Sequence, residues 1–195
     1  MITGFHFVEK TLRYWRPVQR DGEWLEHDGP IVLCRSGLHA SLHPFDALEY
    51  APGDTLCLVT LDGDIQHGED KVVASRRRID RRIDATELLR SFARTCAMDV
   101  IDLWEVPEVV RQYLATGDET IRRAAKDVAW SDEYDAARAA ARDAACGAAM
   151  DAAWYAARAA ARDAAWHAGW QSAFSASRER QRDRFADMVR AAFTS

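Results

Sequence analysis

Side chains that can do chemistry are most concentrated in residues 34–50, Cys-Arg-Ser-Gly-Leu-His-Ala-Ser-Leu-His-Pro-Phe-Asp-Ala-Leu-Glu-Tyr. A strand-like run leads through a glycine turn to His39 and Ser41, and a short helix then presents Tyr50. Polar side chains placed where a strand gives way to a helix often line pockets. The segment therefore predicts a ligand pocket at His39, Ser41 and Tyr50. The alternative, which we favour, is a structural corner in which His39 bonds to the backbone and Tyr50 is packed.

The same segment also offers nitrogen and sulfur ligands of the kind that zinc prefers. They are Cys34, His39 and His43, with His67 or His6 as a fourth ligand. The spacing of the first three matches no common zinc finger, and Pro44 prevents a single helix from bringing His39 and His43 together. We therefore predict no metal site. The sequence also contains no phosphate-binding glycine loop and no hydrolase or kinase signature, so we predict neither a cofactor nor a catalytic residue.

The strongest basic cluster in the sequence spans residues 76–82, Arg-Arg-Arg-Ile-Asp-Arg-Arg. Its arginines are Arg76, Arg77, Arg78, Arg81 and Arg82. Guanidinium groups at this density could pair with phosphates or with an acidic partner surface. The alternative, which we favour, is a solvated edge strand whose charges discourage pairing with another sheet. Any nucleic-acid binding is expected only through this cluster.

Composition narrows the class of protein. The chain has 195 residues, of which 48% are hydrophobic, and its formal net charge is −5. That apolar content is enough to bury a core, and the acidic balance argues against an overall electrostatic grip on nucleic acid or an anionic membrane. The sequence lacks a run of about 18 apolar residues and a signal-peptide pattern. The four cysteines are widely scattered. We therefore predict a cytoplasmic protein with reduced thiols and no membrane association.

Residues 1–83 have the pattern of a mixed α/β domain. Turn signals at 21–22, 28–30, 36–37, 52–54 and 62–64 separate short β-type runs. The clearest runs are 31–34, 55–61 and 71–79. A short helix is predicted over 44–51, between Pro44 at its first turn and the Pro52-Gly53 pair that ends it. This half predicts a small mixed or antiparallel sheet with one short helix.

Residues 84–195 have the pattern of a helical domain. Helices are predicted from Asp84 or Thr86, from Pro107, and from Asp118 after the terminating Gly117. A last helix is predicted to start at Ser175 or Ser177. The fold class is therefore α+β, with the sheet domain followed by an alanine-rich helical bundle.

The alanine-rich segment contains a repeat, because residues 136–145 recur identically at 156–165. Alanine is the best helix former, so both copies are predicted to be helical. At about 100° per residue, a shift of twenty residues turns the second copy to nearly the opposite side of one straight helix. A break near Gly147 is favoured over one long helix that changes its packed face. Trp154, Trp166 and Trp170 supply large apolar surface and are the predicted partner interface.

Residues 34–41, the run Asp46-Ala-Leu-x-Tyr50, the later Gly63 and the strand at 71–76 together resemble an uncharacterised domain family. Such domains occur in phage, prophage and bacterial proteins, some with alanine-rich tails. The likeness covers about residues 10–83, and no activity comes with it.

A much weaker likeness is to ADP-ribosyltransferase-type folds, which bind NAD. That analogy implies that His39 holds a ribose hydroxyl and that Tyr50 stacks on nicotinamide. The analogy also needs a late glutamate, and Glu69, Glu87 and Glu105 are all poorly placed for that role.

The favoured function is a non-enzymatic interaction or accessory protein of a phage or mobile element, with anti-defence activity among its roles. It would bind a protein partner, or a second copy of itself, through the helical half. The alternative is an NAD- or nucleotide-using transferase whose pocket lies at His39, Ser41 and Tyr50. Whether His39 and Tyr50 face one concave pocket separates the two hypotheses.

Overall fold

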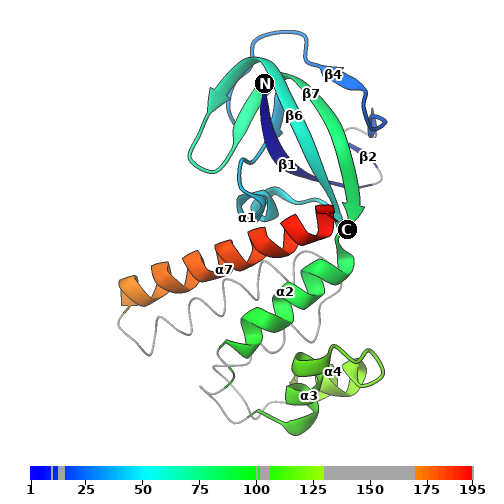
Figure 1. Cartoon of the computed structure of the whole chain (residues 1–195), viewed down its shortest axis with the longest axis vertical. Coiled ribbons are helices and arrows are strands. Elements are labelled where there is room, and N and C mark those ends of the chain that lie inside the picture. Colours follow the sequence, from blue (N-terminus) through cyan, green and yellow to red (C-terminus); the bar gives the residue numbers. More distant parts are fainter. Residues whose placement is uncertain (10, 13–15, 100, 102–105, 130–169, 195) are drawn as a thin grey trace. The chain divides into compact units, whose positions relative to one another are not determined.

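A computed structural model describes residues 1–9, 11–12, 16–99, 101, 106–129 and 170–194 of the chain (Figure 1). The chain forms two compact units, one of residues 1–85 with 188–195, and one of residues 86–187. The fold class is α+β, because an antiparallel sheet of five strands is combined with several helices. Within the described residues, no helix combines the length and the apolar character needed to cross a membrane.

The first unit is built on a long β-hairpin. Its strands are β6 (Thr55–His67) and β7 (Val72–Asp84), which run side by side in Figure 1. The strand order is β1-β6-β7-β4, with β5 also paired to β7. The other strands are β1 (Ile2–Val8), β4 (Trp24–Glu26) and β5 (Leu38–Ala40), with β2 (Thr11–Leu12) and β3 (Arg16–Pro17) forming a separate pair. All of the pairings are antiparallel.

The strand predictions at 55–61 and 71–79 correspond to β6 and β7, but both strands continue further than predicted. The turn predicted at residues 62–64 is wrong, because Gly63 lies inside β6 at a shift in the pairing register between Asp62 and Ile65. Gly63 adopts a φ of 74°, which a bulge in a strand accommodates as readily as a turn does. The hairpin instead reverses at residues 68–71.

The strand predicted at residues 31–34 is also wrong. This segment forms a tight turn in which Val32 and Ser36 exchange two backbone hydrogen bonds of 2.8 Å. Cys34 sits at the tip with a φ of 66°, the left-handed conformation that non-glycine residues seldom adopt. The apolar residues next to Cys34 had suggested a strand. The chain reverses its direction so sharply here that residues 31–34 cannot form a row of hydrogen bonds with a neighbouring strand.

The path of the sheet closes on itself where β5 ends. β5 pairs with the start of β7 through Val72–Ala74, and the next residue, Ser41, exchanges two backbone hydrogen bonds with Phe5 of β1. The short helix predicted over 44–51 follows as α1 (Pro44–Ala47) and the 3₁₀ turn η2 (Leu48–Tyr50). At its start, the ring nitrogen Nδ1 of His43 accepts a hydrogen bond from the backbone N–H of Phe45.

The core of the first unit lies between these strands. It consists of Val8, Ala40, Cys57, Val59, Leu61, Val72, Ala74 and Ile79, each no more than 4% exposed. The strands contribute branched and small side chains at alternate positions, as a half-buried sheet requires. Burial raises the pKa of the Cys57 thiol to about 11, so this thiol is protonated and inert at neutral pH.

The second unit contains the predicted helices as α2 (Thr86–Met98), α3 (Glu108–Thr116), α4 (Arg122–Ala129) and residues 170–187 of α7 (Trp170–Thr194). Gly117 ends α3 with a φ of 68°, as predicted. The Asp118 carboxylate accepts a hydrogen bond of 2.8 Å from the Thr120 N–H, but α4 begins at Arg122, later than the predicted start at Asp118. The rings of Phe92 and Phe185 pack with their centroids 4.8 Å apart.

Of two further expectations for the helical half, one differs from the structure and the other falls outside the described residues. α7 begins at Trp170, before the predicted Ser175 or Ser177. The alanine-rich repeats at 136–145 and 156–165, and with them the break near Gly147, lie outside the described residues.

Candidate functional site

A cavity of about 460 Å³ lies in the first unit, at the place where β5 ends beside β1. Its volume falls within the about 300–1,000 Å³ of typical small-molecule sites. The cavity, called the β5 pocket below, is lined by Phe5 and His6 of β1, the turn residues Cys34, Arg35 and Gly37, the β5 segment His39, Ala40 and Ser41, Ala47 and Tyr50 of the helical turns, and Lys71. All three residues predicted to form a pocket, His39, Ser41 and Tyr50, line it.

His39 organises the turn that forms one wall of the pocket. Its Nε2 accepts a hydrogen bond of 3.0 Å from the backbone N–H of Cys34, and its ring also bonds to the Gly37 backbone. Burial lowers the pKa of His39, and the positive charges of Lys71 and Arg77 act in the same direction. A neutral ring with Nε2 unprotonated fits this arrangement. His39 thus lines the pocket and also bonds to the backbone, which combines the two predicted interpretations.

Tyr50 is held at the pocket rim by two charged neighbours. Its hydroxyl donates a hydrogen bond to the Asp70 carboxylate. The Lys71 ammonium lies 3.9 Å from the centre of the ring, a cation–π contact. Burial and the Asp70 contact raise the pKa of Tyr50, and the side chain remains 43% exposed. Because Lys71 covers one face of the ring, only the other face is open to a ligand.

Two pocket residues have polar side chains without a protein partner among the described residues. Ser41 is 2% exposed, and only its backbone is hydrogen-bonded, to Phe5. His6 is partly buried, and its imidazole has no hydrogen bond within the described part of the chain. Burial lowers the pKa of His6 well below its ordinary value, with the charges of Arg77 and His39 adding to the effect. A hydroxyl and a neutral imidazole are therefore available to a ligand.

The electrostatic character of the β5 pocket is positive. Lys71 and Arg35 line it, while no aspartate or glutamate does so among the described residues. Arg77 adds a third cation behind the lining, because it is 3% exposed and its Nη1 donates a hydrogen bond of 2.6 Å to the carbonyl oxygen of His39. Burial lowers the pKa of Arg77 to about 10, which leaves it charged at neutral pH. Such a pocket attracts an anion.

The five arginines of residues 76–82 are not gathered on one surface. They alternate between the two faces of β7, and Arg77 points inward. Arg76 pairs with Glu26 at 3.0 Å and with Asp62 at 3.2 Å, and Arg78 pairs with Asp80 at 2.7 Å. Arg81 donates to the Phe193 carbonyl oxygen and Arg82 pairs with Asp21.

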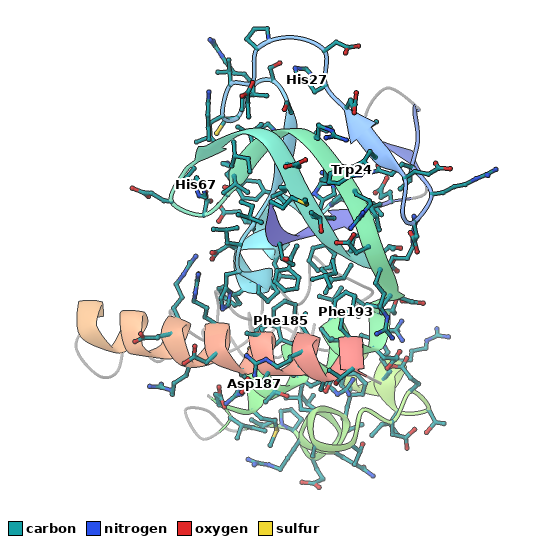
Figure 2. The ribbon with its side chains drawn as sticks, turned by 45° about the horizontal axis from the view of Figure 1, so that its top comes forward. Trp24, His27, His67, Phe185, Asp187 and Phe193 are labelled. Atoms are coloured by element: carbon teal, nitrogen blue, oxygen red, sulfur yellow. The ribbon has the colours of Figure 1, made fainter. Side chains whose placement is uncertain are left out.

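Trp24 of β4, labelled in Figure 2, is in cation–π contact with two of these arginines. The guanidinium carbons of Arg76 and Arg78 are 4.7 Å and 5.0 Å from its ring centre. These contacts stabilise β4 against β7 rather than leaving the charges open. β7 is not an edge strand, because it pairs with β6 on one side and with β4 and β5 on the other. Nucleic-acid binding through the cluster stays a prediction.

The residues of the other hypotheses are only partly brought together. Glu69 and Glu87 do not line the β5 pocket, and Glu105 lies outside the described residues. Of the five residues considered as zinc ligands, Cys34, His39 and His6 line the pocket, whereas His67 lies at the hairpin end of β6 (Figure 2) and His43 caps α1. The described residues contain no group of three or more side chains that could hold a metal ion.

The side chains of the predicted partner interface are not among those that the structure describes. Trp154 and Trp166 lie outside the described residues, and of Trp170 only the backbone, at the start of α7, is described.

Sequence reasoning missed four contributors to the pocket: His6, Arg35, Lys71 and the buried Arg77. His6 had been considered only as a metal ligand and Arg77 only as part of a surface cluster. The usable signal was the β-type alternation of residues 2–8, which places His6 on the same side of the strand as Gly4 and Val8. The approach of Lys71 to Tyr50 depends on where the β6–β7 hairpin reverses, which the sequence pattern placed wrongly.

Residues 2–91 match the family model of a domain of unknown function, DUF7666, a range that includes every residue lining the β5 pocket. This confirms the predicted likeness to an uncharacterised domain family and extends it at both ends. No curated protein and no solved structure matches the chain.

Proposed function

We propose that the first unit is a binding module for a small anionic molecule, which it holds in the β5 pocket. The observation that supports the proposal is that two polar side chains without a hydrogen-bond partner among the described residues line a cavity bordered by positively charged side chains. The buried Ser41 hydroxyl and the His6 imidazole face a cavity bordered by Lys71 and Arg35. A buried polar group without a partner costs free energy, which a ligand that hydrogen-bonds to it would recover.

The expected ligand is a phosphate ester or a carboxylate with a small apolar body. Lys71 and Arg35 would neutralise its charge, and Ser41 would donate a hydrogen bond to one of its oxygens. His6 can act as donor or acceptor according to its tautomer. Phe5, Ala40, Ala47 and the open face of Tyr50 supply the apolar walls.

Binding without catalysis accounts for the residues better than the transferase alternative does. The transferase alternative needs the His39 ring to bind a ribose hydroxyl, whereas its Nε2 already accepts a hydrogen bond from the backbone N–H of Cys34. The hydroxyl of Tyr50 is likewise occupied by Asp70. We retain the proposal of an accessory protein of a phage or mobile element whose helical half binds a protein partner. The pocket would make that interaction responsive to a small molecule.

A thermal-shift screen of the full chain tests the proposal. The panel holds inorganic phosphate, nucleotides, ADP-ribose, NAD, sugar phosphates and small carboxylates, each beside an uncharged analogue. A ligand present at about 100 times its Kd stabilises the native state by about 2.7 kcal/mol. We expect at least one anion to raise Tm while its uncharged analogue does not.

Two variants locate the binding site. Ser41→Ala and Lys71→Met should each reduce the shift, because they remove a donor and a charge from the pocket. Ser91→Ala is the matched control, since Ser91 lies in α2 of the second unit. The proposal is wrong if no anion exceeds its uncharged analogue, or if Ser41→Ala and Ser91→Ala respond alike. An NAD shift accompanied by NAD turnover would favour the transferase instead.

A further inference from the structure

Cys34 lies in the wall of the β5 pocket and is exposed, unlike the buried Cys57 and Cys96. The turn that carries it is fixed by backbone hydrogen bonds between Val32 and Ser36, and by the bond from its own N–H to His39. The thiol is therefore presented to the cavity by a well-determined backbone rather than by a free loop.

A cation, Lys71, lines the same cavity as this thiol. Its ammonium lies 3.9 Å from the centre of the Tyr50 ring, and its interactions with the side chains of Tyr50 and then Cys34 raise the pKa of Lys71. Its ammonium is therefore charged at every physiological pH. Arg35 follows Cys34 in the chain and also lines the cavity.

An independent feature indicates that the cavity in front of Cys34 receives a ligand. Ser41, 2% exposed, faces the same cavity with its hydroxyl unpartnered among the described residues. A molecule held in this cavity of about 460 Å³ can contact both residues, because Ser41 and Cys34 belong to the same lining.

We propose that Cys34 is a thiol-modification site that reacts selectively with small anionic disulfides. Such a disulfide is drawn to the positive charge of Lys71 and Arg35, which raises its local concentration at the sulfur. The Cys34 thiolate attacks one sulfur of the disulfide; a bond between the two sulfurs forms, and the original S–S bond breaks. The released anionic thiolate takes a proton from water. The attacking disulfide is the oxidant, so no further reactant is needed.

The inference shares the positive charge of the β5 pocket with the proposed function, but it does not need a reversibly bound ligand. The mixed disulfide would fill the pocket with the modifying group. Small anionic thiols of the cell would then control whether the pocket is open, and reduction would restore it.

Reaction rates with two disulfides test the inference on the ligand-free full chain. The reagents are dithiobis(nitrobenzoate), which is dianionic, and dithiodipyridine, which is neutral, and peptide mapping assigns the modified cysteine. The ratio of the two rates at Cys34 is measured in the native protein and in the same protein unfolded in urea. We expect the native ratio to exceed the unfolded ratio by about tenfold, within the range that electrostatic steering gives.

Lys71→Met should return the native ratio close to the unfolded value. Arg20→Met is the matched control, because Arg20 is an exposed cation of the same unit that does not line the pocket. Added salt should lower the ratio of the wild-type protein, so the inference can be tested even if the Lys71 variant fails to fold. Equal ratios in native and unfolded protein, or first reaction at another cysteine, would overturn it. A preserved ratio without any thermal shift from anions would instead remove only the proposed function.

Discussion

His6 and His39 lie on the same pocket wall, yet their surroundings give them different roles. The Nε2 atom of His39 accepts a hydrogen bond from the Cys34 N–H in the turn that also contains Gly37. The ring of His6 has no hydrogen bond among the described residues. The sequence singled out His39 because it stands in a glycine turn, but a motif does not reveal whether the backbone already occupies the ring. One histidine therefore builds the pocket, and the other is available to bind.

Replacing His39 with alanine should destabilise the protein, because the Cys34 N–H would lose its acceptor. We expect a loss of about 0.5–1.5 kcal/mol in the free energy of unfolding, measured by urea titration, because the bond lies at an exposed site. Ser41→Ala removes a hydroxyl that has no protein partner, and it should cost clearly less. If the two variants lose equal stability, the Ser41 hydroxyl has a hydrogen-bond partner within the protein, which would contradict its assignment as a free donor.

Stability should also depend on pH through both histidines. Burial lowers the pKa of His6 and of His39 from the ordinary value of 6.5, so the folded protein keeps both rings neutral at a pH where the unfolded chain takes up protons. Their contribution is therefore present above about pH 6.5 and is lost as the pH falls towards the folded-state pKa values.

Urea titrations at about pH 7.5 and about pH 5.5 measure this dependence. His6→Gln and His39→Gln should each make the loss on acidification smaller. His67→Gln is the control, because His67 is exposed at the end of β6. An unchanged pH dependence in both pocket variants would contradict the assigned environments.

The turn between residues 31 and 38 depends on a close approach between elements. Gly37 has a φ of 112°, and a Cβ placed on it would come within 2.5 Å of the Val73 side chain in β7. Two constraints therefore act at this position: a backbone conformation that favours glycine, and the packing of the turn against the sheet.

Gly37→Ala tests this packing with a well-matched control. Gly29 has a similar φ of 118°, but a Cβ there would meet nothing within 4 Å. Gly29→Ala should cost about 1–2 kcal/mol for the backbone alone. Gly37→Ala should cost at least about 1 kcal/mol more, because Val73 must move, and thermal unfolding of the two variants compares them. Equal losses would mean that the turn does not pack on β7 as described.

Local patterns predicted the described helices and the strands β6 and β7, but neither the five shorter strands β1 to β5 nor where the chain reverses. Helix signals such as Pro107, Gly117 and Asp118 act within a few residues, and the structure follows them. Gly63 also carries a turn signal, yet it lies inside β6, because a glycine with positive φ suits a bulge as well as a turn. Only the long pairing of β6 with β7 decides between the two.

Taken as a whole, the chain is acidic, with a net charge of −5, while the described lining of its pocket contains cations and no carboxylate. The net charge of the chain argued against binding to large anionic partners. A net charge is summed over the whole chain, so it does not show that one pocket is locally positive. His39, Ser41 and Tyr50 could be predicted from the sequence because they follow one another along a single corner. For His6 the alternation of residues 2–8 indicated only a side of its strand. That His6, Lys71 and Arg77 lie near that corner could not be predicted, because only the folded sheet brings them there.

The most direct test of the anion-binding pocket is an NMR titration that follows the histidine ring signals of the full chain. Signals are assigned with the His6→Gln, His39→Gln and His67→Gln variants, and the titrant is the anion that gives the largest thermal shift, with inorganic phosphate as a second titrant. We predict that the His6 ring signals move in a saturable manner, because His6 faces the ligand without a protein partner. The His67 signals should stay fixed. Saturable movement at His67 with an unchanged His6, or no saturable movement at all, would contradict the account.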